Sequence, residues 1–208
     1  MSNSKEIKKV QNETNKKNKS IKIGLISQDS SYINANELFN KYFEKSKPNT
    51  YMIKDKNRFE FSLLNLPQIS ISIHNIKKLE DINDKYHIYN FFIIFIDIQN
   101  SSSKSFLDKS LDTIIEADDN NFNKKCYIYG FYKNNENEKI TEEKITTISE
   151  AKGIEYYYNE VTIDDIESFS KLIECTINDC NTIMIEKELA KKHSEIASDN
   201  SNSHCIIC

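Results

Sequence analysis

The chain has 208 residues, of which 38% are hydrophobic and 29% charged, and its formal net charge at pH 7 is −4. This length suits one domain with tails, and the hydrophobic content is enough to build its core. The slightly acidic balance provides no overall basic field, so we expect no nucleic-acid partner.

The N-terminal part is polar and rich in lysine. Residues 1–20 contain six lysines and two glutamates among many Asn and Ser, which predicts a disordered basic arm. The start MSNSKEIKKV has no apolar stretch typical of a signal peptide, and no segment is long enough to span a bilayer. We therefore expect the protein on the cytosolic side of membranes, with reduced cysteines.

Neither the histidines nor the cysteines have metal-ligand spacing, so no metal site is predicted.

The first half of the folded part mixes strands and helices. A short apolar strand is predicted at residues 21–27 (IKIGLIS), and a helix with its large apolar residues on one face at residues 36–45. Residues 51–53 and 58–66 flank a turn-like stretch and predict a β-hairpin. Residues 74–87 have a mixed pattern that predicts a helix.

The second half alternates strands and helices. Residues 91–98 (FFIIFIDI) are almost entirely apolar, which is typical of a central parallel strand buried on both faces. Serines at 101–103 and acids after Thr141 indicate helix starts, and Gly153 suits a helix end. The predicted strands are at 91–98, 126–130 and 155–158, and the predicted helices at 103–117, from 141 to near 153, and at 164–181.

This order of elements predicts a three-layer α/β fold with a mostly parallel, six-stranded sheet and one antiparallel edge pair. Ligands in such folds bind beyond the carboxyl ends of the strands. We therefore expect a site in the loops after Ser27, Asn65, Ile98, Gly130 and Tyr158.

Several stretches of the sequence resemble a Rab-type small GTPase of the Ras superfamily. They are IKIGLIS with NELFNKYF, YHIYNFFIIFIDIQNSSSKSF, CYIYGFYKNN and EEKITTISEAKGIEYYYNEVTIDDIESF. The resemblance implies a Rab-like domain at residues 21–181 with the small-GTPase (P-loop NTPase-like) architecture. It also implies the ligands of that family, GTP or GDP with Mg²⁺.

The segment that matches the family's phosphate-binding loop, SQDSSYINANE at residues 27–37, has no glycine and no lysine. Glycines in such a loop let backbone N–H groups approach the phosphates, the lysine neutralises them, and a hydroxyl holds Mg²⁺. Here Ile33 or Ala35 takes the lysine position, and Asn34 or Asn36 takes the hydroxyl position.

The other family motifs are altered as well. The D-x-x-G motif falls on Asn65 and Gln68, which removes a carboxylate that helps to hold Mg²⁺ and a hinge glycine. The guanine-reading N-K-x-D motif falls at residues 131–134, which include Lys133 and Asn134, or one residue later; its carboxylate is missing in either alignment. These losses predict that GTP hydrolysis and tight GTP binding are absent.

Residues 182–208 are predicted to form a flexible tail that ends in HCIIC. Cys205 precedes two aliphatic residues and Cys208 follows them, which is the pattern of a prenylated cysteine. The two-cysteine end resembles those of Rab proteins, so Cys205 and Cys208 are the predicted lipidation sites. Two lipid chains give a stable anchor, whereas one attaches only marginally.

Together the resemblance implies a pseudo-GTPase of Rab type that acts in vesicle trafficking and protein transport. It would be a lipoprotein, held by a prenyl anchor on the cytoplasmic face of intracellular membranes, with a cytosolic pool. Its implied partners are protein effectors and the machinery of prenylation and escort. No catalytic residue is predicted.

Two alternatives stay open at this point. A divergent but active GTPase would bind phosphates through Ser30, Ser31 and backbone N–H groups. A receiver-like or flavodoxin-like fold is disfavoured because no clear acidic pair follows the first strand. For the pseudo-GTPase, Phe131 and Tyr132 are candidates to fill the vacated base pocket.

Overall fold

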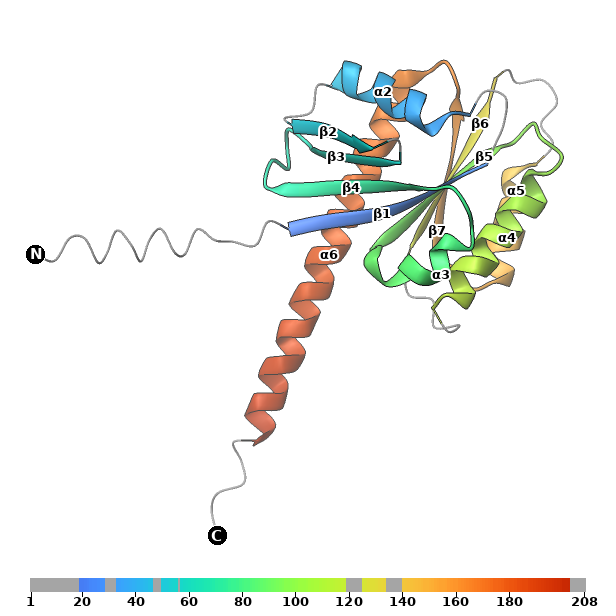
Figure 1. Ribbon diagram of the computed structural model, residues 1–208. Helices are drawn as coiled ribbons and strands as arrows, with labels where there is room; N and C mark the ends of the chain where they lie inside the picture. The colour runs from blue at the N-terminus through green and yellow to red at the C-terminus, as the bar shows by residue number, and fades with distance from the viewer. Residues whose placement is uncertain are drawn as a thin grey trace, which may run out of the picture.

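A seven-stranded sheet runs through the middle of the computed structural model, in the strand order β2-β3-β4-β1-β5-β6-β7 (Figure 1). The structure describes residues 19–28, 33–46, 50–55, 57–118, 125–133 and 140–202. The strands are β1 (Lys19–Ser27), β2 (Thr50–Asp55), β3 (Arg58–Ser62), β4 (Ile69–Ile76), β5 (Phe91–Asp97), β6 (Cys126–Tyr132) and β7 (Tyr156–Thr162). The helices are α2 (Ala35–Ser46), α3 (Asp81–Lys85), α4 (Ser103–Glu116), α5 (Glu142–Ala151) and α6 (Ile166–Asn202), with the 3-10 turn η1 (Tyr86–Ile88).

The sheet is parallel except where β3 reverses direction. β1 pairs in parallel with β4 on one side and with β5 on the other, so that Ile23 lies opposite both Ile73 and Phe91. β6 and β7 continue the parallel pairing, whereas β3 is antiparallel to both β2 and β4. The predicted α/β class, the mostly parallel sheet and the β2–β3 hairpin are confirmed.

β4 is a strand that the sequence analysis did not predict, and it gives the sheet one strand more than expected. The helix predicted at residues 74–87 is wrong in its first part, because β4 continues to Ile76 and helical structure begins only at Asp81. Ile71 and Ile73 are fully buried on one face of β4, and Ser70 and Ser72, which alternate with them, point to the other face. This strand lies beside β1 and pairs with it in parallel.

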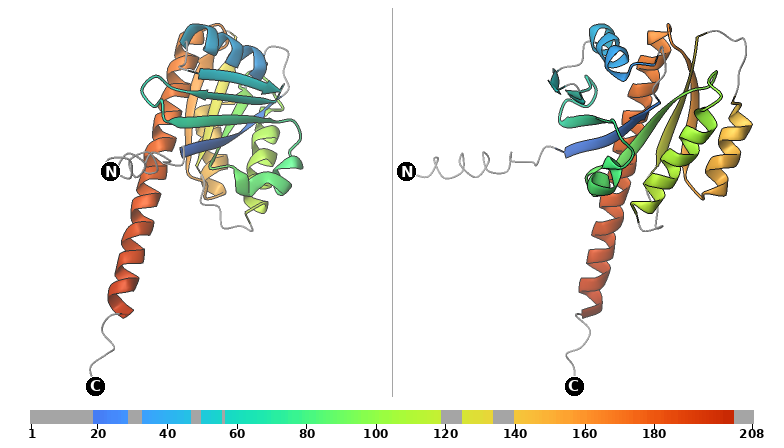
Figure 2. Two further views of the ribbon diagram at one scale, coloured as in Figure 1. Left: turned by 60° about the vertical axis from the view of Figure 1, so that its left-hand side comes forward. Right: turned by 45° about the vertical axis from the view of Figure 1, so that its right-hand side comes forward.

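Helices cover both faces of the sheet (Figure 2), and a hydrophobic core lies on each face. On the face covered by α2 and α6, the rings of Phe39 and Phe169 pack edge to face with centroids 5.7 Å apart. The other face is covered by α3, α4 and α5, whose buried residues include Leu107 and Ile145. All seven residues of β5 are buried between these layers, as the apolar run predicted.

α6 is a 37-residue helix that extends well beyond the sheet (Figures 1 and 2). Ile183 is 9% exposed and belongs to the core, whereas Ile185 and Leu189 are 40% and 50% exposed. The predicted boundary between domain and flexible tail at residues 181 and 182 therefore falls inside a helix that still packs on the domain. At the other end, Lys19 already belongs to β1, and the rest of the predicted basic arm, residues 1–18, lies outside the described residues.

Candidate functional site

The candidate site lies where the carboxyl ends of β1, β5 and β6 meet, because loops at this edge bind ligands in α/β folds. Of the predicted site residues, Asn34, Asn36 and Lys133 follow strands at this edge. Ser30, Ser31, Asn134, Cys205 and Cys208 lie outside the described residues.

Asn65 does not join this group. It lies in the turn between β3 and β4, and because β3 runs antiparallel to β4, that turn is at the amino end of the parallel strands. Its Nδ2 donates a hydrogen bond of 3.1 Å to Asn178 Oδ1 on α6. The expectation that the loop after Asn65 contributes to the ligand edge is therefore wrong; the residues that follow the strand beside β1 are Lys77 and Lys78.

The positions expected to hold the phosphate-loop lysine carry buried apolar side chains. Ile33 is 6% exposed and Ala35 is 4% exposed, and both belong to the core cluster that contains Phe39. An ammonium group at either position would have to leave water for this apolar cluster, at a large desolvation cost. Neither position can therefore supply a cation to a phosphate.

Asn34 caps helix α2. Its Oδ1 accepts hydrogen bonds from the backbone N–H groups of Asn36 at 3.1 Å and Glu37 at 3.2 Å. Free N–H groups at a helix N-terminus are what bind phosphate in many folds, and here the side chain of Asn34 occupies two of them. Asn36 Oδ1 is buried and has no hydrogen-bond partner within the described part of the chain.

A buried polar network fastens the end of β1 to the start of α4. Gln28 Oε1 accepts a hydrogen bond of 2.9 Å from Asp97 N–H and one of 2.8 Å from Ser103 Oγ. Gln28 Nε2 donates to Ser102 Oγ at 3.1 Å, and Ser103 Oγ also contacts the carbonyl of Asp97. Gln28 and Ser103 are almost fully buried, so the network is part of the structure of this edge and not a free set of donors.

The loop that follows β5 is held by its own side chains. Asp97 Oδ1 accepts the N–H of Gln99 at 3.0 Å, and Asn100 Oδ1 accepts the N–H of Ser102 at 2.9 Å, so both residues form side-chain turns. The serine run was expected to cap α4, but Ser102 makes no side-chain cap hydrogen bond there. Its hydroxyl instead donates to Asn100 Oδ1 at 2.8 Å.

The expected base-reading positions are mostly part of strand β6. Phe131 is fully buried, with its ring centroid 4.9 Å from that of Phe95, so it fills the core under α6. Tyr132 is half-buried and packs on the opposite core. Lys133 is exposed, and its backbone N–H donates to Gln99 Oε1 at 3.0 Å. Phe131 and Tyr132 therefore lie on opposite faces of the sheet and do not jointly fill one pocket.

Two ionisable groups of β6, Cys126 and Tyr129, are buried in the core and do not face this edge. Burial raises the pKa of the Cys126 thiol and of the Tyr129 phenol, and both groups belong to the core, where they stay protonated. Within the described part of the chain, no group of three or more His, Cys, Asp or Glu residues could hold a metal ion.

Sequence reasoning missed Gln28, Ser102 and Ser103 as a connected unit. A signal was present, since a polar residue directly after a buried parallel strand must find partners at the same edge. The pairing partner could not be identified, because Ser103 is far away in the chain and only the adjacency of β1 and β5 brings it near.

A search of protein-family models finds no match to this chain, and a search of curated proteins finds none either. What the fold defines is a class: an α/β protein with a mostly parallel sheet between two helical layers, compatible with a P-loop-like architecture. Among the described helices, none combines the length and the apolar character needed to cross a membrane.

Proposed function

We propose that this chain is a Rab-like pseudo-GTPase that acts in intracellular membrane trafficking as a lipid-anchored recruiter of protein partners. The order of strands and helices is compatible with a P-loop-like fold, which supports the small-GTPase part of the proposal. The stretches that resemble the Rab family fall on β1, β5, β6 and the elements that follow them.

The main support for the proposed loss of nucleotide binding is that the residues at the phosphate-loop positions have structural roles. Ile33 and Ala35 are packed into the core, and Asn34 uses the N–H groups at the start of α2. A triphosphate placed at this edge would meet neither a lysine from these positions nor free N–H groups at N2 and N3 of the helix. The scaffold is therefore proposed to serve as a docking surface for partners.

The membrane anchor in this proposal depends on Cys205 and Cys208, whose spacing around two isoleucines predicts prenylation. α6 would then connect the folded domain to the anchor, because it continues from the core at Ile183 as far as Asn202. Effectors and escort proteins are the proposed partners of the anchored form.

A nucleotide-binding experiment tests directly whether the chain has lost the ability to bind GTP and GDP. The full chain, purified from cells without added nucleotide, is titrated with a fluorescent guanine nucleotide in the presence of Mg²⁺, and the nucleotide content of the purified protein is measured. We expect no bound GDP or GTP and no submicromolar affinity. Submicromolar binding would establish the alternative of a divergent active switch, and loss of that binding in Ser30→Ala/Ser31→Ala would identify its phosphate contacts.

The anchor is tested separately by expressing the chain in a prenylating cell and measuring the mass of the C-terminal peptide. We expect lipid on Cys205 or Cys208 and membrane fractionation that is lost in Cys205→Ser/Cys208→Ser. If the C-terminal peptide is unmodified in both the soluble and the membrane fraction, the lipid anchor is removed from the proposal. The result of the nucleotide experiment is not affected.

A further inference from the structure

A pocket of about 540 Å³ lies at the carboxyl end of β4, between the β2–β3 turn and helix α3. Its lining includes Arg58 from β3, Lys77 from the loop after β4 and Lys85 from α3. Ligand pockets for small molecules commonly have about 300–1,000 Å³. The pocket is therefore large enough for a small molecule, and three cationic residues come to it from three different elements.

The cationic side chains that line this pocket have N–H donors that no residue of the described chain uses. Arg58 has five N–H donors, and two of them are used, by Nε with Ser72 Oγ at 3.3 Å and by Nη2 with the Glu60 carboxylate. Lys77 and Lys85 are exposed and form no ion pair with an acid in the described part of the chain. Excess positive charge beside open donors is the arrangement that binds phosphate.

The walls of the pocket are held in place before any ligand arrives. His74 Nε2 lies 2.9 Å from Ser72 Oγ, and its ring packs edge to face on Tyr89, with centroids 5.5 Å apart. The N–H of Asn75 donates to the carbonyl of Asn57 at 2.7 Å, which closes the β2–β3 turn over the end of β4. Burial and the nearby Asp81 carboxylate raise the pKa of Tyr89, so its phenol stays a hydrogen-bond donor.

One acidic residue, Asp81, also lines the pocket. A carboxylate only accepts hydrogen bonds, so it opposes a bare phosphate but suits the hydroxyl groups of a larger ligand. A ligand that carries both a phosphate and several hydroxyls would satisfy the two kinds of side chain together. The lining is mostly polar, with Ile76 and Tyr89 as its apolar members, and this also favours a hydroxylated ligand.

We propose that this pocket binds a phosphorylated polyol, with the phosphate held by Arg58, Lys77 and Lys85 and a hydroxyl group by Asp81. The same chemistry occurs in soluble sugar or inositol phosphates and in the headgroups of phosphoinositide lipids. The site lies beside α3 and includes Lys77 from the loop that follows β4, but it contains none of the residues expected to bind nucleotide, so it does not depend on the proposed pseudo-GTPase function.

Binding is measured by isothermal calorimetry and by ¹⁵N chemical-shift titration of the full chain. The probes are myo-inositol 1-phosphate, inorganic phosphate and myo-inositol. We expect the phosphate ester to bind most tightly, inorganic phosphate more weakly and myo-inositol not at all, with shifts at Lys77, Lys85 and His74. No binding of the ester by the wild-type chain at millimolar concentration would overturn the proposal.

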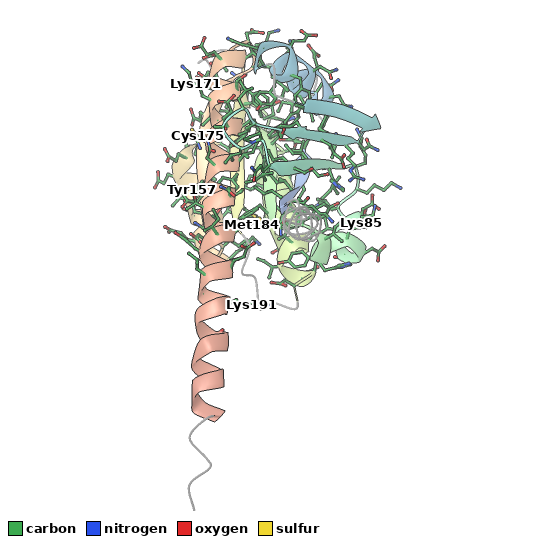
Figure 3. All side chains as sticks on the ribbon, turned by 90° about the vertical axis from the view of Figure 1, so that its left-hand side faces the viewer. Lys85, Tyr157, Lys171, Cys175, Met184 and Lys191 are labelled. Carbon is green, nitrogen blue, oxygen red and sulfur yellow. The ribbon has the colours of Figure 1, made fainter. Side chains whose placement is uncertain are left out.

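Two charge-matched double variants separate the pocket from general electrostatics. Lys77→Gln/Lys85→Gln is expected to weaken ester binding by about tenfold or more, because two phosphate contacts are lost. Lys171→Gln/Lys191→Gln removes the same charge from α6, where Lys171 and Lys191 lie along the helix and apart from Lys85 (Figure 3), and is expected to leave binding unchanged. Equal losses in both variants would show unspecific attraction and contradict the site.

Asp81→Asn tests the hydroxyl contact. This variant is expected to bind inorganic phosphate more tightly and to lose its preference for the ester, since the repulsion and the hydrogen-bond acceptor are both weakened. An unchanged preference would remove Asp81 from the site.

Vesicle flotation then distinguishes the two sources of the ligand. Cys205→Ser/Cys208→Ser protein is mixed with phosphatidylcholine vesicles with or without a phosphoinositide, so that no lipid anchor contributes. Flotation that needs the phosphoinositide and is lost in Lys77→Gln/Lys85→Gln assigns the site to a lipid headgroup. Ester binding without flotation assigns it to a soluble molecule.

Discussion

Ser103 Oγ lies 2.8 Å from Gln28 Oε1, and this hydrogen bond joins the residue after β1 to the first turn of α4. Both side chains are buried, so no water can replace the bond at low cost. Because the same Gln28 oxygen also accepts Asp97 N–H, one amide connects β1, the end of β5 and α4.

Removing this amide should therefore destabilise the fold. Gln28→Ala removes the side-chain acceptor of the Asp97 N–H and one of the two hydrogen bonds of the Ser103 hydroxyl, and we expect it to lower the free energy of unfolding by about 1–3 kcal/mol. Gln68→Ala, a substitution at an exposed glutamine, should change it by about 0.5 kcal/mol or less. Urea unfolding followed by circular dichroism measures both, and equal effects would contradict the role of the network.

The cap formed by Asn34 predicts a second stability effect. Asn34→Ala leaves the N–H groups of Asn36 and Glu37 without their side-chain acceptor, which should cost about 1 kcal/mol. Asn34→Ser keeps an acceptor at the cap and should retain most of this stability. Asn40→Ala, on the exposed side of the same helix, serves as control and should not destabilise, since alanine is the better helix former. A neutral Asn34→Ala would show that the cap does not stabilise α2.

Alanine substitutions at two isoleucines of α6 test how far along this helix the contacts with the core extend. Ile183 is 9% exposed and Ile185 is 40% exposed, so truncation removes core contacts only at the first. We expect Ile183→Ala to lower the free energy of unfolding by about 2 kcal/mol or more and Ile185→Ala by less than about 0.5 kcal/mol. Comparable losses at the two positions would mean that the domain continues beyond Ile183.

Asp165 makes the stability depend on pH in the acid range. The hydroxyl and the backbone N–H of Ser168 both donate to its carboxylate, at 2.6 Å and 3.0 Å, and these bonds hold the pKa of Asp165 below its ordinary value of 3.8. A lowered pKa in the folded state means that the unfolded chain binds the proton more tightly. The stabilisation is therefore complete above about pH 4 and is lost as the pH falls through the folded-state pKa.

The measurement is the difference in urea midpoint between the wild-type chain and Asp165→Asn, followed from about pH 6 to about pH 2. The variant keeps a side-chain oxygen at the start of α6 but cannot ionise. The wild-type advantage should shrink towards the acid end. A difference that stays constant across this range would show that the Asp165 carboxylate does not contribute.

Elements with a strong local pattern were predicted from the sequence, although the second strand of the hairpin ends at Ser62 and not at Leu66 as expected. β5 is an unbroken apolar run, the β2–β3 hairpin has a turn signal, and Gly153 has the positive φ of 65° that suits the residue after a helix. In each of these cases the signal lies in residues that are neighbours in the sequence.

β4 was missed although its sequence, ISISIHNI, alternates isoleucine and serine. Its conformation depends on pairing with β1, which lies far away in the chain, and the mixed residues from His74 onward obscured its end. That omission moved the expected ligand loop to Asn65, at the wrong end of the sheet. The last helix was expected to end at residue 181, although no Gly or Pro follows Asn181 to end it. The contact of Ile183 with the core depends on the tertiary structure and could not be predicted from the sequence.

The position of β1 in the centre of the sheet sets the order in which the protein can fold during synthesis. Of the described strands β1 is made first, yet both of its neighbours, β4 and β5, are made much later, and the described core residues of α6 follow them. The antiparallel strands β2, β3 and β4 can pair earlier, because they follow one another in the sequence. Such long-range pairing is typical of chains that fold in about milliseconds to seconds, and until β4 emerges the segment KSIKIGLIS stays unpaired and exposed to aggregation.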